Sequence, residues 1–323
     1  MKNEKLSKKI FLSFSILMNY DAVLLIAFGG PEKMEDVHPF LANVLKGRPV
    51  PPQRLEEVIH HYKLFGGRSP LNEITFRQAQ ALEATLAQQG PRLPVYVGMR
   101  NWHPYLHETL ERMAANGVKR ALSLILSAQQ SEAGWERYQE NVATARAQVG
   151  EHAPVIDYAP GWPNHPLFIN AVMELTRSAL AQIDADRRVH TPLVFTAHSV
   201  PVAMPGTPRY VQQIEEGARL VAEQLGHTRW SIAYQSRSGD PRTPWLEPDI
   251  GAVLPKLAAD WVQDVVVVPI GFVCDHIEVL YDLDTEAKQI AIKHGLNFIR
   301  AGAVNGHPSF IRMLAEVVRA AIE

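Results

Sequence analysis

The sequence predicts an α/β fold in two similar halves, and three observations support this. Short apolar runs rich in β-branched residues alternate with amphipathic helical stretches along most of the chain. The runs are continuous, which is typical of parallel strands covered by helices on both faces. Four runs come before about residue 160 and four come after it. The length of 323 residues also suits about two domains.

The first half supplies the first four expected strands. Its opening run, AVLLIAF, is followed by a long gap in which segment 45–53, LKGRPVPPQ, is rich in proline and indicates a loop. Apolar residues at helical spacing fill most of the later gaps, as βα alternation requires. The expected strands are 22–28, 95–99, 120–126 and 155–159, and the expected helices are 73–89, 103–116 and 132–149.

The second half repeats this alternation. Segment 236–245, SRSGDPRTPW, again indicates a loop that could overhang a cleft. A (β/α)₈ barrel has the same number of elements, but the uneven spacing of the runs argues against it. The expected strands are 192–199, 230–236, 265–272 and 297–301, and the expected helices are 165–186, 208–226, 249–261, 276–294 and 307–322.

The composition excludes several classes of protein and of site. A net charge of -2 and a pI of about 6.7 leave no basic surplus for binding nucleic acid. Cys274 is the single cysteine, which rules out an intrachain disulfide framework and a cysteine-rich zinc or iron–sulfur site. This suits a reducing cytoplasm, the expected location. Residues 1–17 are expected to be an extension, and no run approaches the about 20 apolar residues of a membrane span.

Three carboxylates, Glu278, Asp282 and Glu286, are spaced four residues apart in an expected helix and should stack along one face. Like charges at this spacing cost an isolated helix about 0.2–0.5 kcal/mol per pair. Asp275 and Glu278 have the spacing of a capping box, which explains one acid without any function. The core-facing stripe is expected at Leu283, Ala287 and Ile290. The acids then form either a solvated face or a face that binds cations or relays protons.

Polar residues follow several expected strands, where ligands bind in open parallel sheets. His198 ends the fifth strand and is either structural, a ligand for an ion such as Fe²⁺, or a proton acceptor. Ser199 lacks the glycines of a nucleophile elbow. Arg100 follows the second strand and either binds a carboxylate or forms a surface pair. Asn72 either caps a helix or contributes to binding.

Six segments, in this order, resemble motifs of the ferrochelatase family. They are LLIAFGGPE, GGRSPLNEIT, GMRNWHPY, FTAHSVP, AYQSRSGDPRTPWLEPD and PIGFVCDHIEVLYDLDTEAK. The resemblance implies a lyase that inserts Fe²⁺, its substrate, into a porphyrin in haem biosynthesis and releases two protons. It also implies two Rossmann-like domains, 18–160 and 161–306, each a four-stranded parallel sheet flanked by helices, with the active cleft between them. The last helix, 307–323, is expected to pack back on the first domain.

The resemblance also implies roles for single residues. The catalytic and metal-binding pair falls on His198 and Glu278, with the imidazole on one side of the macrocycle and the carboxylates on the other. Asp282 and Glu286 continue an acidic path for metal or protons, where a second divalent ion could bind. The residues that match porphyrin-lining positions are Phe28, Tyr62, Ser69, Arg100, Tyr138 and Trp245. Some bacterial members carry an iron-ligating tyrosine where this chain has Phe28, which offers no ligand atom.

The resemblance leaves two porphyrins open, coproporphyrin III and protoporphyrin IX. The short segment between Gly47 and Gly67 favours coproporphyrin III, because it leaves the cleft open for extra propionates. A sirohydrochlorin-type chelatase and a non-catalytic haem- or metal-binding protein of two lobes are the alternatives. One cysteine cannot hold a [2Fe–2S] cluster. We expect a monomer without a transmembrane segment or nucleic-acid partner, and peripheral contact with a membrane stays open.

Overall fold

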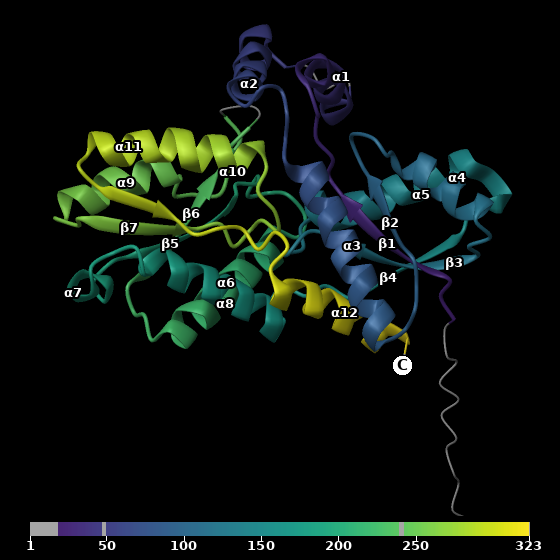
Figure 1. Cartoon of the computed structure of the whole chain (residues 1–323). Coiled ribbons are helices and arrows are strands. Elements are labelled where there is room, and N and C mark those ends of the chain that lie inside the picture. Colours follow the sequence, from purple (N-terminus) through teal and green to yellow (C-terminus); the bar gives the residue numbers. More distant parts are fainter. Residues whose placement is uncertain (1–18, 47–49, 239–241, 323) are drawn as a thin grey trace, which may run out of the picture.

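A computed structural model describes residues 19–46, 50–238 and 242–322. Within them the chain forms two four-stranded parallel sheets, with strand orders β2-β1-β3-β4 and β6-β5-β7-β8 (Figure 1). The same spatial order in both sheets confirms the predicted two similar halves. The strands are β1 (Ala22–Ala27), β2 (Val95–Met99), β3 (Arg120–Ile125), β4 (Val155–Tyr158), β5 (Leu193–His198), β6 (Trp230–Gln235), β7 (Asp264–Val268) and β8 (Asn297–Arg300).

Helices connect these strands at the predicted places, with two differences of type. The expected helix 132–149 begins as a π-helix, and the expected helix 276–294 contains one. The helices of the first half are α3 (Leu71–Gln89), α4 (Leu106–Ala115), η1 (Glu132–Glu136), α5 (Arg137–Val149) and the short 3₁₀ turn η2 (Gly150–His152). Those of the second half are α6 (Pro166–Leu180), α7 (Ala185–Arg188), α8 (Thr207–Leu225), α9 (Ile250–Ala259), α10 (Ile277–Tyr281), the π-helix η3 (Asp282–Ala287), α11 (Lys288–Lys293) and α12 (Pro308–Ile322).

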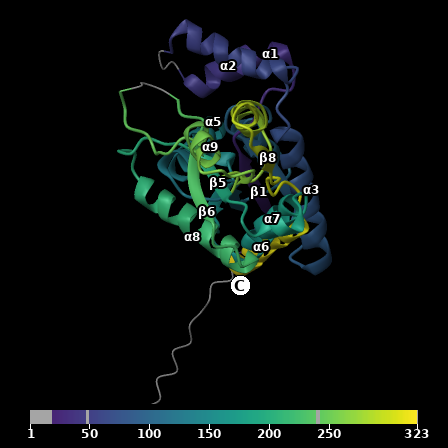
Figure 2. The same ribbon diagram turned by 90° about the vertical axis from the view of Figure 1, so that its left-hand side faces the viewer.

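Two further helices, α1 (Met34–Leu45) and α2 (Pro52–Leu64), lie in the gap where the sequence predicts only a loop. Figures 1 and 2 both show them above the sheets, on the side away from α12. α1 contains Pro39, a residue that usually breaks a helix interior. None of the residues of α2 is fully buried. The weak helical signal of α2 therefore follows from a position over the ends of the strands, where it covers little apolar surface.

The two halves share one hydrophobic core. Its largest cluster joins Val23 of β1 and Phe195 of β5 to Phe310 of α12. α12 packs against α3 of the first half and also against α6 of the second. Arg319 Nη1 donates to Gln89 Oε1 at 2.9 Å at the end of this contact. The last helix thus connects the halves, while the predicted domain limits stay predictions.

The strands end where the candidate site begins. β7 stops at Val268, four residues earlier than predicted, because Pro269 has no N–H to continue the ladder. The chain then turns, and the Gly271 N–H donates to the Thr196 carbonyl oxygen at 3.0 Å. This contact places the segment before α10 beside the end of β5. Among the helices of the described residues, none combines the length and the apolar character that crossing a membrane requires. The predicted extension, 1–17, lies outside the described residues.

Candidate active site

His198 is the last residue of β5, so its side chain stands at the carboxyl end of the second sheet. Its Nδ1 is hydrogen-bonded to the Ser199 carbonyl oxygen. A carbonyl only accepts hydrogen bonds, so Nδ1 carries a proton and Nε2 is the nitrogen that can gain or lose one. The Tyr210 hydroxyl donates to the His198 carbonyl oxygen at 3.0 Å and holds the backbone beneath the ring. The imidazole is 32% exposed, which leaves it accessible to a ligand.

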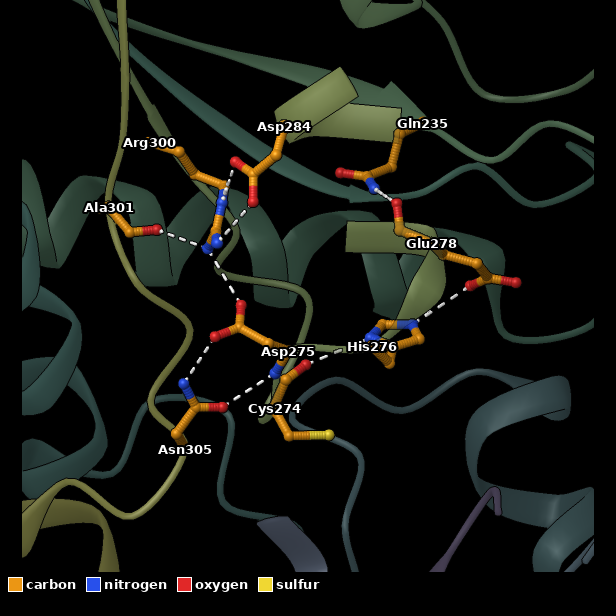
Figure 3. Close-up of polar contacts among 9 residues, drawn as sticks. All are labelled: Gln235, Cys274, Asp275, His276, Glu278, Asp284, Arg300, Ala301 and Asn305. Carbon is orange, nitrogen blue, oxygen red and sulfur yellow. Dashed lines mark hydrogen bonds and ion pairs between the residues drawn. The ribbon is translucent and has the colours of Figure 1, made fainter. Parts of the chain in front are cut away.

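Glu278 lies on α10 between two imidazoles. Its Oε2 is 3.4 Å from His276 Nε2, a contact drawn in Figure 3, and 3.8 Å from His198 Nε2. Burial by itself would raise the pKa of Glu278, but the charge of His198 and the hydrogen bond from His276 outweigh it and lower the pKa to about 2. Burial would lower the pKa of His276, whereas its bond to Glu278 produces a net rise. Glu278 is therefore a carboxylate throughout the physiological pH range.

The short distance between His198 and Glu278 corrects the expectation that they face opposite sides of a macrocycle. Atoms in van der Waals contact with a flat ring lie about 3.5 Å from it, so groups on opposite faces are about 7 Å apart. The 3.8 Å between His198 Nε2 and Glu278 Oε2 leaves no room for a ring. The two side chains instead form one polar face and can approach the same atom from one side.

The three acids predicted to stack on an α-helical face lie on a helix that changes type. Glu278 is on α10, Asp282 opens the π-helix η3, and Glu286 lies inside it. A π-helix has i→i+5 hydrogen bonds, so residues four apart no longer stack directly. The prediction of a uniform α-helical ladder is therefore wrong. The core stripe is confirmed at Leu283 and Ala287, both of which are buried.

Asp282 differs from Glu278 in its proton affinity. Burial raises the pKa of Asp282 to about 7, and the charges of Glu278 and Glu286 act in the same direction, against the hydrogen bond from Ser236 Oγ. One acid of the site thus stays ionised while another can hold a proton near neutrality. Across the part of the chain that the structure describes, no group of three or more His, Cys, Asp and Glu side chains could hold a metal ion. The second divalent ion stays a prediction.

Asp275 does not form the predicted capping box. The residue that caps α10 is His276, whose side chain makes no capping hydrogen bond. Asp275 instead accepts from Arg300 Nη1 at 3.0 Å and from Asn305 Nδ2 at 2.7 Å (Figure 3). The carboxylate of Glu278 is likewise turned to the imidazoles and not to the helix end. Both acids therefore serve the site or its support, and neither caps the helix.

Four of the residues predicted to line a porphyrin meet in the first half. Arg100, just after β2, has its Cζ 5.9 Å from the ring centre of Phe28 and 5.4 Å from that of Tyr138, which are cation–π contacts. Phe40 of α1 joins them to α2, because its ring centre is 6.3 Å from Phe28 and 5.9 Å from Tyr62. We call Phe28, Phe40, Tyr62, Arg100 and Tyr138 the aromatic wall.

The aromatic wall lies close enough to Glu278 for the charge of this carboxylate to act on two of its tyrosines. Burial raises the pKa of Tyr62, and the negative charge of Glu278 raises it further. Burial also raises the pKa of Tyr138 to about 12, with Glu278 acting in the same direction. In addition, His61 of α2 stacks on Tyr281 of α10, with ring centres 3.5 Å apart. Residues from both halves therefore surround one site, as the strand-end argument predicts.

Ser69 and Asn72 support the loop after β1. Asn72 Oδ1 accepts from the Gly30 N–H at 2.9 Å, and its Nδ2 donates to the Gly30 carbonyl oxygen at 2.8 Å. Asn72 lies inside α3, so a capping role for it is wrong. A Cβ on Gly30 would lie 2.7 Å from Ser69 Cβ, which explains why glycine stands there. Ser69 is buried against this loop, and its contact with a porphyrin stays a prediction.

Trp245, predicted to line the porphyrin, lies beside the segment that follows His198. Its backbone pairs with Pro201 in an antiparallel bridge. The Ser199 hydroxyl donates to the Leu246 carbonyl oxygen at 2.9 Å and is thereby engaged by the backbone. The indole N–H of Trp245 is buried and has no hydrogen-bond partner among the described residues. It can donate to an acceptor on a bound molecule.

Comparison with known proteins identifies the family. A protein-family model described as "Ferrochelatase" matches residues 20–322. The chain belongs to the ferrochelatase family. It is 44% identical over 306 residues to the ferrochelatase of Rhodopirellula baltica, covering 94% of this chain and 87% of that one. It is 46% identical over 310 residues to the coproporphyrin III ferrochelatase of Nocardia farcinica, covering 94% and 88%. The predicted family is confirmed.

Solved structures confirm the fold class of this ferrochelatase. The structure described as SirB from Bacillus subtilis with Fe³⁺ matches with a TM-score of 0.55 at 12% identity, covering 93% of this chain and 95% of that one. The sirohydrochlorin chelatase SirB from Bacillus subtilis subspecies spizizenii in complex with cobalt gives 0.51 at 11%, covering 93% and 94%. At such identities these likenesses show the two-domain chelatase fold alone.

Sequence reasoning missed His276 and Phe40 at this candidate site. His276 contacts Glu278 directly, and Gln235 Nε2 donates to the Glu278 carbonyl oxygen at 3.0 Å, so β6 helps to hold α10 (Figure 3). A histidine two residues before the acid was a readable signal for the first. Gln235 is a polar residue at the end of an expected strand, which is a signal for the site, whereas Phe40 gave none because its contacts join segments far apart in the chain.

Proposed function

We propose that the protein inserts Fe²⁺ into coproporphyrin III and releases two protons, a lyase reaction of haem biosynthesis. The observation that carries this is the His198–Glu278 pair, 3.8 Å apart on one polar face that lies near the aromatic wall. Three of the similar proteins, from Mycolicibacterium smegmatis, Nocardia farcinica and Mycolicibacterium vanbaalenii, are named coproporphyrin III ferrochelatase, which supports that porphyrin.

The charges of the site suit an exchange of two pyrrole protons for one Fe²⁺. Glu278, ionised because its pKa is near 2, can hold the dication together with the imidazole of His198. His198 Nε2 can accept a pyrrole proton when it is unprotonated, since Nδ1 is engaged by the Ser199 carbonyl. Asp282, with a pKa of about 7, can take up that proton and release it to solvent. His198 thus serves the proton and the metal in turn, and Asp282 takes the proton away without binding the metal.

The aromatic wall provides the surface on which the macrocycle would lie. Phe28 and Tyr62, the partly exposed rings of this wall, would contribute apolar stacking area, and Arg100 would bind a carboxylate of the porphyrin. Coproporphyrin III carries four propionates and protoporphyrin IX two, and the short segment between Gly47 and Gly67 favours the former. Phe28 offers no ligand atom to the iron from this wall. The predicted cytoplasmic location and monomeric state stay predictions.

Metal insertion by the purified protein tests the proposal. We expect Fe²⁺ insertion into both porphyrins, faster with coproporphyrin III, and a loss of at least about 100-fold in Glu278→Gln with porphyrin binding retained. His198→Ala should lose activity similarly. Glu223→Gln, an exposed acid of α8 paired with Arg219, is the control and should keep the wild-type rate. A strong preference for protoporphyrin IX would refute the substrate, and wild-type turnover in Glu278→Gln would refute the mechanism.

The same assay separates the alternative functions. A non-catalytic haem- or metal-binding protein would bind porphyrin but insert no metal, so Glu278→Gln would change no rate. A sirohydrochlorin-type chelatase would insert metal into sirohydrochlorin and not into a porphyrin. The imidazole–carboxylate pair at the polar face favours the ferrochelatase reaction over both, because it provides an anion for the metal and a base for the protons.

A further inference from the structure

Arg300 lies behind the polar face and contacts neither His198 nor Glu278. It is the last residue of β8, its side chain is 14% exposed, and it donates to two acids at once (Figure 3). Nε and Nη2 bind the two oxygens of Asp284 at 2.6 and 2.9 Å, and Nη1 binds Asp275 Oδ1 at 3.0 Å. Asp284 lies in the π-helix η3, and Asp275 lies just before α10. One guanidinium therefore holds both ends of the short segment that carries Glu278.

This segment needs such support for two physical reasons. Five carboxylates lie between residues 275 and 286, so the segment is strongly self-repelling. It also contains the π-helix η3, a rare conformation that interrupts the regular α-helical hydrogen bonds of the segment. The Arg300 guanidinium donates to both carboxylate oxygens of Asp284 and opposes both effects. It adds positive charge to the segment, and its two parallel hydrogen bonds fix the orientation of the Asp284 side chain.

The support continues into the first half. The second oxygen of Asp275 accepts from Asn305 Nδ2 at 2.7 Å, and the Asp275 N–H donates to Asn305 Oδ1 at 2.8 Å. The carbonyl oxygen of Asn305 in turn accepts from Gln78 Nε2 of α3 at 2.8 Å. A chain of hydrogen bonds thus runs from α3, through Asn305 and Asp275, to Arg300 and η3. This chain fixes the segment that carries Glu278 relative to the first half, which carries the aromatic wall.

We propose that Arg300 is a positioning residue, which holds Asp275 and Asp284 so that the Glu278 carboxylate stays beside His198 on the polar face. This rests on the proposed function, because its rate test uses metal insertion. Replacing Arg300 keeps both His198 and Glu278 in the protein but allows the segment that carries Glu278 to move. A displacement of about 1 Å at a reacting group lowers a rate about 100-fold.

Arg300→Met and a matched control test this. Arg187 also bridges two acids, Asp264 and Asp184, each at 2.9 Å, but at the amino end of the same sheet. We expect Arg300→Met to lower kcat for Fe²⁺ insertion about 10- to 100-fold with the porphyrin KM changed less than about threefold. Arg187→Met should destabilise the fold without changing kcat. Arg300→Lys, which keeps the charge without the fork, should recover part of the rate.

Two measurements separate positioning from simple stability. In the Glu278→Gln background, adding Arg300→Met should cost less than about twofold, because both changes act through one carboxylate. Hydrogen exchange of residues 277–287 should speed up in Arg300→Met and not in Arg187→Met. If Arg300→Met does not fold, Asp284→Asn replaces it with the same expectations. Two results would overturn the proposal. One is that Arg300→Met lowers the rate as much in the Glu278→Gln background as in the wild type. The other is a folded Arg300→Met variant with unchanged kcat and unchanged hydrogen exchange of residues 277–287.

Hydrogen exchange also distinguishes a wrong positioning role for Arg300 from a wrong proposed function. A wild-type protein that inserts no metal would refute the function, whereas the exchange of 277–287 would still report on the positioning role. Normal wild-type insertion with an Arg300→Met rate equal to it would refute the positioning role alone.

Discussion

Gly271→Ala is the substitution for which the structure gives the sharpest expectation. Gly271 lies in the turn between β7 and α10, and its N–H donates to the Thr196 carbonyl oxygen at 3.0 Å. A Cβ added there would lie 2.6 Å from Ala197 Cβ and 2.7 Å from Ala197 Cα. Ala197 directly precedes His198, so any shift of this backbone also moves the His198 imidazole.

The magnitude follows from the contact distance. Carbon atoms pack at about 3.5–4.0 Å, so the turn and β5 must separate by roughly 1 Å to admit the methyl group. Overpacking of this kind costs about 1–3 kcal/mol in the free energy of unfolding. A displacement of about 1 Å at His198 should lower the rate of metal insertion about 100-fold.

Guanidinium-induced unfolding and Fe²⁺ insertion measure the two effects. Gly302→Ala is the control, because a Cβ at Gly302 would meet Leu175 Cδ2 at 3.5 Å, an ordinary contact. The control should keep its activity and its free energy of unfolding within about 1 kcal/mol of wild type. If Gly271→Ala had wild-type stability and wild-type rate, the close approach of the turn to β5 would not be what positions His198.

Two further predictions concern the support and the charge of the site. Asn72→Leu removes both partners of the Gly30 backbone, so the free energy of unfolding should fall by about 2–6 kcal/mol, at about 1–3 kcal/mol for each unsatisfied group; a smaller fall than for an exposed control such as Asn116→Leu would contradict this. Asp282 has its pKa raised from 3.8 to about 7, so the folded protein binds a proton there that the unfolded chain has lost, and stability falls as pH rises from 3.8 to 7. Asp282→Asn should flatten that fall in unfolding curves taken between pH 4 and pH 8, and an unchanged slope would show that Asp282 titrates normally.

Many residues of the candidate site could be predicted because they lie at the carboxyl ends of expected strands. His198 was predicted as a candidate because it closes an apolar run, and the rule that ligands bind at the carboxyl ends of parallel strands needs only the order of elements. Glu278 was visible as one of several regularly spaced acids. Arg100 and Phe28 follow other strands, and the structure brings them together with Tyr138.

Other features could not be read in this way. The i, i+4 spacing of Glu278 and Asp282 predicts an α-helical face, but the segment changes to a π-helix after α10. Inside this π-helix Asp284 accepts a hydrogen bond from Arg300 of β8, a contact that the spacing of the acids does not indicate. Helix α2 was missed because it covers the site with few buried side chains, so its sequence lacks a strong apolar stripe.

The sequence alone determined the family, the four-plus-four order of strands and the identity of the His198–Glu278 pair, because these depend on short apolar runs and on motifs within them. Only the tertiary structure decided that His198 and Glu278 share one polar face. It also decided that Gln78 and Asn305, 227 residues apart, join the two halves behind it. The physical reason is that such contacts join side chains whose distance in space bears no relation to their separation along the chain.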